Sequence, residues 1–323
     1  MTKVVSILAA GHSGSTLLDI LTGTIPGVFS TGESVYFPWQ LHRNGKVCDL
    51  GQDICSCGER FSNCKIWRAV VSKISKKAGY DLFDNPFRFK MAMYKNQMYG
   101  HQVSMSTRIV RALFLRSLKY CPSSPLLKVF VFPVCASLKN NWIFFDTICQ
   151  TTGATHVVDS SKDIVRMALL QQSRPGDIFT VVLIRDIEGV AASAAKREQD
   201  PLLEAQRWLK LYQQYMHIIK RQKDFQVKVV RYETMVEEPD KTREQLAQYL
   251  GLVLPPSVPL AINTKAHHLV AGNPMRYKGR IHIQYDDSWK KVLTKETKKQ
   301  IYALKHKYES ILDGLESLAW ERS

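Results

Sequence analysis

The sequence contains no uninterrupted apolar run of the roughly 20 residues that a membrane-spanning helix needs. Its first residues pass directly into an apolar segment and a glycine-containing loop, without the charged region, apolar core and cleavage site of a secretory leader. We therefore expect a cytoplasmic protein with no membrane partner. The 7 cysteines are an odd number, which argues against a framework of disulfides and favours reduced thiols or ligands.

Acidic residues are scarce: 29 Asp and Glu stand against 45 Lys and Arg, which gives a formal net charge of +16. This excess favours an anionic partner, such as a phosphate, a sulfate, a nucleic acid or an anionic membrane surface. The basic residues are spread along the chain, however, without an aromatic-interleaved basic cluster or a nucleic-acid-binding motif. We therefore expect no nucleic-acid partner.

The order of the predicted elements is typical of an α/β fold. Short β-branched runs alternate with longer helical patterns, which predicts a three-layer architecture, a parallel sheet of about five strands flanked by helices, in a single domain over residues 1–323. The predicted strands are residues 4–10, 28–30, 155–158, 178–184 and 226–230, and the helices that follow include 15–21, 162–172, 187–197 and 241–250. Ligands of such sheets bind at the carboxyl ends of the strands, where we expect the chemistry.

Three other segments stand out. Residues from about 61 to 152 are helical and aromatic in pattern, and we interpret them as an inserted helical subdomain in which only residues 129–132 are a candidate strand. Residues from about 252 to 290 are rich in Pro, Gly, His and basic residues, which is typical of a long functional loop. Residues 294–312 predict a surface amphipathic helix.

The loop after the first predicted strand has the composition of an anion cradle. Its glycines let the backbone wrap an anion, and the following helix offers unpaired amides. The residues expected to hold the anion are Ser13, Gly14, Ser15, Thr16 and Leu17. An ATP- or GTP-hydrolysing enzyme would carry lysine at the position of Ser15 and glycine at the position of Ala9, so that activity is disfavoured. A kinase-like nucleotide-binding protein, a non-catalytic anion-binding module and a plain strand-to-helix turn remain the alternatives.

The run Ser13-Gly14-Ser15-Thr16 resembles the 5′-phosphosulfate loop of sulfotransferases, with His12 at a position that this family usually fills with Lys or Arg. The resemblance implies a P-loop-like sulfotransferase fold and the donor 3′-phosphoadenosine-5′-phosphosulfate (PAPS), which leaves as 3′-phosphoadenosine-5′-phosphate (PAP). Further matches follow the predicted strands and lie in the 252–290 segment, which the resemblance makes a loop covering the cofactor. They imply contacts to the 3′-phosphate or adenine from Arg185, Ser193, Tyr232, Arg276, Lys278 and Gly279.

The resemblance also implies a set of catalytic groups. Glu33 is expected to take the proton of the acceptor, although it could instead cap a helix that begins near Val35. Lys162 is expected to stabilise the transferring group, or else only to pair with Asp159. His12 is expected to donate to the bridging oxygen, and His267 and His268 are weaker candidates for proton transfer.

The expected reaction is the transfer of a sulfuryl group from PAPS to a hydroxyl or amine of a small molecule, and it requires no metal. A bacterial secondary metabolite such as a saxitoxin-type alkaloid is one candidate acceptor, and a carbohydrate or a lipid headgroup is the alternative.

One cysteine cluster is left unexplained by this function: Cys48, Cys55, Cys57 and Cys64. Four thiolates suit tetrahedral zinc, but the tight pair is C-x-C rather than the usual C-x-x-C. Buried thiols or an oxidised pair remain the alternatives, and we assign no metal to the catalytic site.

Overall fold

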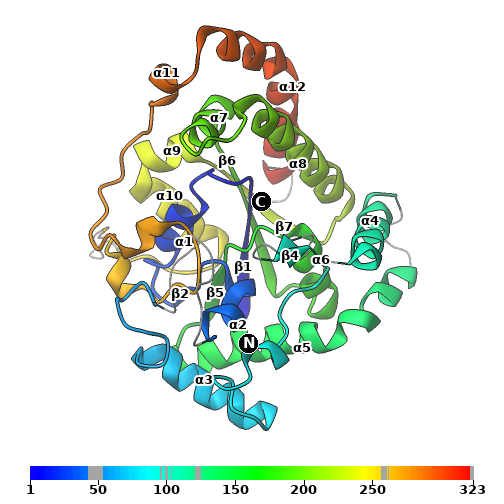
Figure 1. The fold of residues 1–323 in the computed structure, drawn as a ribbon, viewed down its shortest axis with the longest axis vertical. Coiled ribbons are helices and arrows are strands. Elements are labelled where there is room, and N and C mark those ends of the chain that lie inside the picture. Colours follow the sequence, from blue (N-terminus) through cyan, green and yellow to red (C-terminus); the bar gives the residue numbers. More distant parts are fainter. Residues whose placement is uncertain are drawn as a thin grey trace.

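The computed structural model describes residues 1–42, 54–94, 97–98, 101–102, 104–120, 125–255, 260 and 262–320. At its centre lies one five-stranded parallel sheet, with strand order β2-β5-β1-β6-β7. The strands are β1 (Lys3–Ala9), β2 (Val28–Ser30), β5 (His156–Asp159), β6 (Ile178–Ile184) and β7 (Gln226–Arg231). Helices flank the sheet (Figure 1), so the predicted α/β class is confirmed.

Side chains of successive strand residues point to opposite faces of the sheet, and each face packs against its own layer of helices. Val4 and Leu8 of β1 belong to one apolar cluster, whereas Val5 and Ile7 belong to the other. The first layer contains α3 (Lys65–Ala78), α5 (Cys135–Thr152), α6 (Ile164–Ser173), α7 (Ile187–Ala195), α8 (Pro201–Arg221) and α12 (Lys295–Trp320). The second contains α1 (Ser15–Thr22), α9 (Tyr232–Glu237) and α10 (Pro239–Tyr249).

The strand order creates a crevice between β1 and β6. From β1 the chain runs through α1 to β2, at one edge of the sheet. From β6 it runs through α7 and α8 to β7, at the opposite edge. Ala9 pairs with Leu183, so the loop that follows Ala9 and the residue that follows β6 leave the sheet side by side. Such a reversal of direction is where parallel α/β sheets form binding sites.

The described part of residues 61–152 is mainly helical. It contains α3, α4 (Met105–Tyr120) and α5, with a small antiparallel pair formed by β3 (Gln97–Met98) and β4 (His101–Gln102). The candidate strand at residues 129–132 is wrong, because this stretch forms the 3-10 turns Pro125–Phe130 and Phe132–Val134. Pro133 fixes its own backbone and lacks the N–H that a strand would need, and Phe132 is 87% exposed.

Several helix limits differ from the predictions for local reasons. Helix α6 begins at Ile164 rather than at residue 162, because the Asp163 carboxylate accepts from the N–H groups of Val165 and Arg166 and caps the helix there. Helix α12 continues to Trp320, well beyond residue 312. Among the described helices, none has the length and apolar character that crossing a bilayer demands.

Candidate active site

A cleft of about 310 Å³ opens at the carboxyl ends of the central strands. Most of the site residues expected from the sequence line it: His12, Gly14, Ser15, Thr16, Leu17, Glu33, Lys162, Arg185, Ser193 and Tyr232. Gly11, Arg197 and residues 272–275 complete the lining. The cleft therefore joins the first loop, the carboxyl ends of β2, β5, β6 and β7, helix α7 and the C-terminal loop.

The cradle is built by the turn from β1 into α1. Gly14 precedes the helix in the left-handed region, with φ of 87°. A Cβ atom at this position would lie 2.6 Å from Cδ2 of Tyr232, so only glycine allows the ring to pack against the loop. The first-turn amides of α1 have no acceptor within the helix and are available to an anion in the cleft.

Arg185 leaves the end of β6 and is held in place from several sides. Its guanidinium lies 4.4 Å from the centre of the Tyr232 ring and donates to the His12 carbonyl at 3.1 Å and to Asp286 Oδ2 at 3.0 Å. A Cβ at Gly189 would lie 2.7 Å from Arg185 Nε, so the glycine in α7 makes room for this side chain. Ser193 lies one turn further along α7 and also lines the cleft, so the structure brings Arg185 and Ser193 to one end of it.

Positive charge gathers around His12. Arg197, which the sequence analysis missed, lies just beyond α7 with Nη1 3.2 Å from His12 Nε2. Because arginine only donates, Nε2 accepts and the proton of a neutral imidazole is on Nδ1. Burial lowers the pKa of His12, and the charges of Arg197, Lys162 and Arg185 lower it further while Glu204 raises it. His12 is therefore held as a neutral donor in a cationic pocket.

The opposite wall of the cleft carries Glu33 and Lys162. Lys162 adopts a left-handed backbone conformation, with φ of 57°, and donates from Nζ to Glu33 Oε1 at 2.6 Å and to the Ser160 carbonyl at 3.3 Å. The Glu33 N–H donates to the carbonyl of Ala271 at 3.1 Å. The carboxylate thus faces Lys162 rather than capping the turn that follows it, so the capping alternative for Glu33 is wrong.

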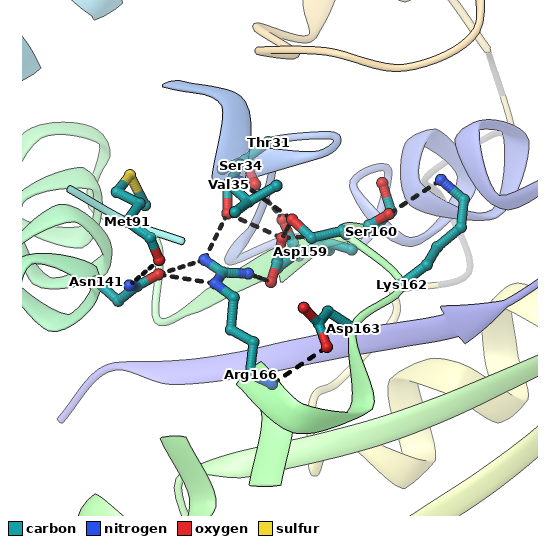
Figure 2. A network of polar contacts seen from close by, with 12 residues as sticks. Thr31, Ser34, Val35, Met91, Asn141, Asp159, Ser160, Lys162, Asp163 and Arg166 are labelled. Atoms are coloured by element: carbon teal, nitrogen blue, oxygen red, sulfur yellow. Dashed lines mark hydrogen bonds and ion pairs between the residues drawn. The ribbon is translucent and has the colours of Figure 1, made fainter. Parts of the chain in front are cut away.

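The alternative pairing of Lys162 with Asp159 is also wrong, because Asp159 forms a buried ion pair with Arg166 (Figure 2). The same carboxylate accepts from the hydroxyl groups of Ser34 and Ser161, and Arg166 donates to Asn141 as well. Ser34 follows Glu33 and Ser161 precedes Lys162 in the chain. The network therefore fixes the two strand ends that present the Glu33 and Lys162 side chains.

Four of the expected cofactor contacts are not on the lining of the cleft. Ser13 is fully buried, and Lys278 and Gly279 lie outside the lining residues. Arg276 is also fully buried, and its guanidinium donates to the carbonyls of Leu269 and Val270. Arg276 satisfies backbone acceptors inside its own loop, which corrects the expectation that it faces the cofactor.

The C-terminal loop instead contributes residues 272–275 to the cleft. The Asn273 N–H donates to Thr16 Oγ1 at 3.1 Å, and Gly272 has φ of 142° with the position of its missing Cβ only 3.1 Å from the same oxygen. The loop therefore closes directly onto the cradle through its backbone.

A buried carboxyl group, Asp19, lies behind the cradle on α1. Burial raises its pKa to about 7 from 3.8, and the hydroxyl groups of Ser160 and Ser30 offset part of this effect. The folded protein thus keeps a proton that the unfolded chain releases above about pH 4, and its stability falls as the pH rises from about 4 to about 7.

Asp19→Asn should remove this pH dependence. We expect the variant to gain up to about 3 kcal/mol of unfolding free energy relative to the wild type near pH 8 and close to none near pH 4. Urea denaturation at both pH values measures the difference. An equal change in unfolding free energy at both pH values would contradict the assignment of a raised pKa to Asp19.

No protein-family model matches the chain, and no curated protein matches it either. Among solved structures, a sulfotransferase domain from the curacin biosynthetic pathway is similar, with 15% identity, coverage of 94% of this chain and 98% of that chain, and a TM-score of 0.46. A sulfotransferase domain from the olefin synthase of Synechococcus PCC 7002 has 12% identity, 94% coverage of each chain and a TM-score of 0.43. Retinol dehydratase in complex with androsterone and PAP has 9% identity, coverage of 96% and 80%, and a TM-score of 0.41.

Proposed function

We propose that this chain is a sulfotransferase that moves the sulfuryl group of PAPS to a hydroxyl or amine of a small-molecule acceptor. The observation that carries the proposal is the pairing of Lys162 Nζ with Glu33 Oε1 at 2.6 Å, in the same cleft as an anion cradle and Arg185. A carboxylate that can take a proton is thereby placed beside several groups that stabilise negative charge.

The residues present fit PAPS and its product PAP. The helix N-terminus of the cradle suits the 5′-phosphosulfate. Gly14 and Gly272 let Tyr232 and the C-terminal loop pack closely against the cradle, because a Cβ at either position would meet Tyr232 or Thr16. Arg185 and Ser193 at the other end suit the 3′-phosphate, and Tyr232 lies between the two regions against both Gly14 and Arg185. When bound, PAPS supplies an activated sulfuryl group.

Each catalytic side chain then has a distinct task. Glu33 takes the proton of the acceptor hydroxyl or amine, and Lys162 orients the Glu33 carboxylate and offers positive charge beside the group being transferred. His12 donates a hydrogen bond from its neutral imidazole to the oxygen that carries the departing charge. Arg197, with Nη1 3.2 Å from His12 Nε2, adds positive charge beside that oxygen.

Titration calorimetry and an acceptor screen test the proposal. We expect PAP to bind and ATP–Mg to bind far more weakly, because the loop lacks the phosphate-binding lysine of nucleotide triphosphatases. The screen pairs PAPS with guanidinium alkaloids of the saxitoxin type, carbohydrates and lipid headgroups, and detects the added sulfuryl group by mass spectrometry. Preferred binding of ATP–Mg would favour the kinase-like alternative, and PAP binding without transfer to any acceptor would favour an anion-binding module.

Asp286 competes with the expected 3′-phosphate for Arg185. Burial would raise its pKa, but hydrogen bonds from Ser288 and Arg185 outweigh this and lower it to about 2, so the side chain is an anion at neutral pH. Asp286→Asn keeps the shape and removes the charge, and we expect PAP affinity to rise roughly 3- to 10-fold in calorimetry. Asp287→Asn, which alters a 61% exposed neighbour paired with Lys290, is the matched control. Unchanged or weaker binding by Asp286→Asn would place the phosphate elsewhere.

A further inference from the structure

Three cysteines and one histidine from distant parts of the chain meet at a single point. The ligand atoms of Cys55, Cys57, Cys64 and His268 all lie within 4.8 Å of one another. His268 Nδ1 is 3.5 Å from Cys55 Sγ and 3.3 Å from Cys64 Sγ, and the sulfurs of Cys57 and Cys64 are 3.8 Å apart. Cys48, the fourth cysteine of the sequence cluster, lies outside the described residues.

The three individual distances match those between the corners of a zinc tetrahedron. With Zn–S bonds of about 2.3 Å and Zn–N bonds of about 2.0–2.1 Å, tetrahedral angles place two sulfurs about 3.8 Å apart and a sulfur and a nitrogen about 3.5 Å apart. A disulfide would instead require about 2.05 Å between the sulfurs. The spacing thus fits a shared central ion better than an oxidised pair.

The backbone around the sulfurs forms a tight turn followed by the start of a helix. A tight turn brings Cys55 and Cys57 together: the Cys55 N–H donates to the Glu59 carbonyl at 2.8 Å, and the Gly58 N–H donates to the Cys55 carbonyl at 2.9 Å. Cys64 directly precedes α3, where the helix dipole favours negative charge.

His268 is oriented toward the three sulfurs by its surroundings. Its ring is stacked on Phe29 with 6.3 Å between ring centres and an interplanar angle of 2°. Ser56, between two of the cysteines, donates to the His267 carbonyl at 2.6 Å and accepts from the Leu269 N–H at 3.0 Å. The histidine is therefore bracketed by backbone contacts to the same turn that carries Cys55 and Cys57.

We propose that Cys55, Cys57, Cys64 and His268 bind one zinc ion. Four protein ligands close the tetrahedron and leave no position for water or substrate, so the site is structural rather than catalytic. The usual C-x-x-C pair is replaced here by C-x-C, and the fourth ligand comes from a residue 204 positions after Cys64.

The ion would tie the C-terminal loop to the body of the protein next to the cleft. Beyond His268, the Val270 N–H donates to the Thr31 carbonyl at 2.7 Å, and the Ala271 carbonyl accepts from the Glu33 N–H. Residues 272–275 then line the cleft. Zinc thereby anchors the start of the wall that faces the cradle.

Metal analysis of the purified full-length protein tests the assignment. We expect about one zinc per chain, lost on chelation and restored by added Zn²⁺. Cys57→Ser and His268→Gln should lose that equivalent, whereas Cys149→Ser, a half-buried cysteine on α5, is the matched control and should retain it.

A second measurement uses the wild-type protein and does not depend on whether a variant folds. Co²⁺ bound to the stripped protein should give the strong visible bands of a tetrahedral site and thiolate-to-metal charge transfer, and hydrogen exchange of residues 267–275 should accelerate when the metal is removed. A folded wild-type protein that binds neither Zn²⁺ nor Co²⁺, or a mass spectrum showing a disulfide between Cys57 and Cys64 in protein prepared under reducing conditions, would overturn the proposal.

Discussion

Glu33→Gln should lower turnover with a hydroxyl acceptor roughly 10²–10⁴-fold and leave PAP affinity almost unchanged. Glutamine has nearly the same size and still accepts the hydrogen bond from Lys162 Nζ, but it cannot take the acceptor proton. The loss should be smaller with an amine that is already neutral at the assay pH, because such an acceptor needs less help from a base. Steady-state rates with both acceptor classes, together with calorimetry with PAP, measure the effect.

Two variants control for indirect effects. Glu238→Gln changes a 49% exposed glutamate paired with Lys241 and should leave turnover unchanged. The double variant Glu33→Gln, Lys162→Met tests the role of Lys162. If Lys162 acts mainly by orienting Glu33, turnover of the double variant should be close to that of Glu33→Gln alone. If Lys162 also acts on the transferring group, turnover should fall further. Near-normal turnover of Glu33→Gln with a hydroxyl acceptor would move the base elsewhere, with His12 the next candidate.

Arg185→Ala should weaken PAP binding roughly 30- to 150-fold, the equivalent of about 2–3 kcal/mol for a charge-assisted contact. The side chain is 7% exposed, so the lost interaction is shielded from water. Arg185→Lys keeps the charge but loses the two-pronged geometry and the stacking on Tyr232. We therefore expect its affinity for PAP to lie between those of the wild type and Arg185→Ala.

The matched control for this series is Arg174→Ala, which removes a 35% exposed arginine that is paired with Asp146 and does not line the cleft. Circular dichroism and thermal melting establish that each variant is folded before affinity is compared. Wild-type affinity for PAP in a folded Arg185→Ala protein would contradict the assignment of the 3′-phosphate to this end of the cleft.

The sequence predicted best what depends on neighbouring residues. The strand runs, the Ser13–Thr16 loop and the strand-end positions of Glu33, Lys162 and Arg185 follow from local patterns, and the parallel sheet then brings them to one edge. The direction of a side chain in an irregular loop does not follow from such patterns. Arg276 therefore turned inward to satisfy carbonyls rather than outward to the cleft.

Two other features depended on tertiary contacts. Arg197 lies four residues after Ser193, a helical spacing that could have placed it beside the site, but its contact with His12 crosses 185 positions of sequence. His268 was considered only for proton transfer, because nothing in the sequence links it to a cysteine turn more than 200 residues earlier.

The backbone pairing of Thr31 and Glu33 with Val270 and Ala271 has a consequence for the order of folding. During synthesis, the β2 side of the sheet emerges long before residues 270–271, so the edge groups that they pair with stay uncovered until those residues follow. The sheet can assemble once β7 has emerged, but the wall beside Glu33 is completed only after residues 270–271 follow. Competence to bind a ligand therefore arrives late, after the scaffold has formed, and a ribosome-bound chain ending before residue 270 would carry the cradle and the base with one side of the cleft still open.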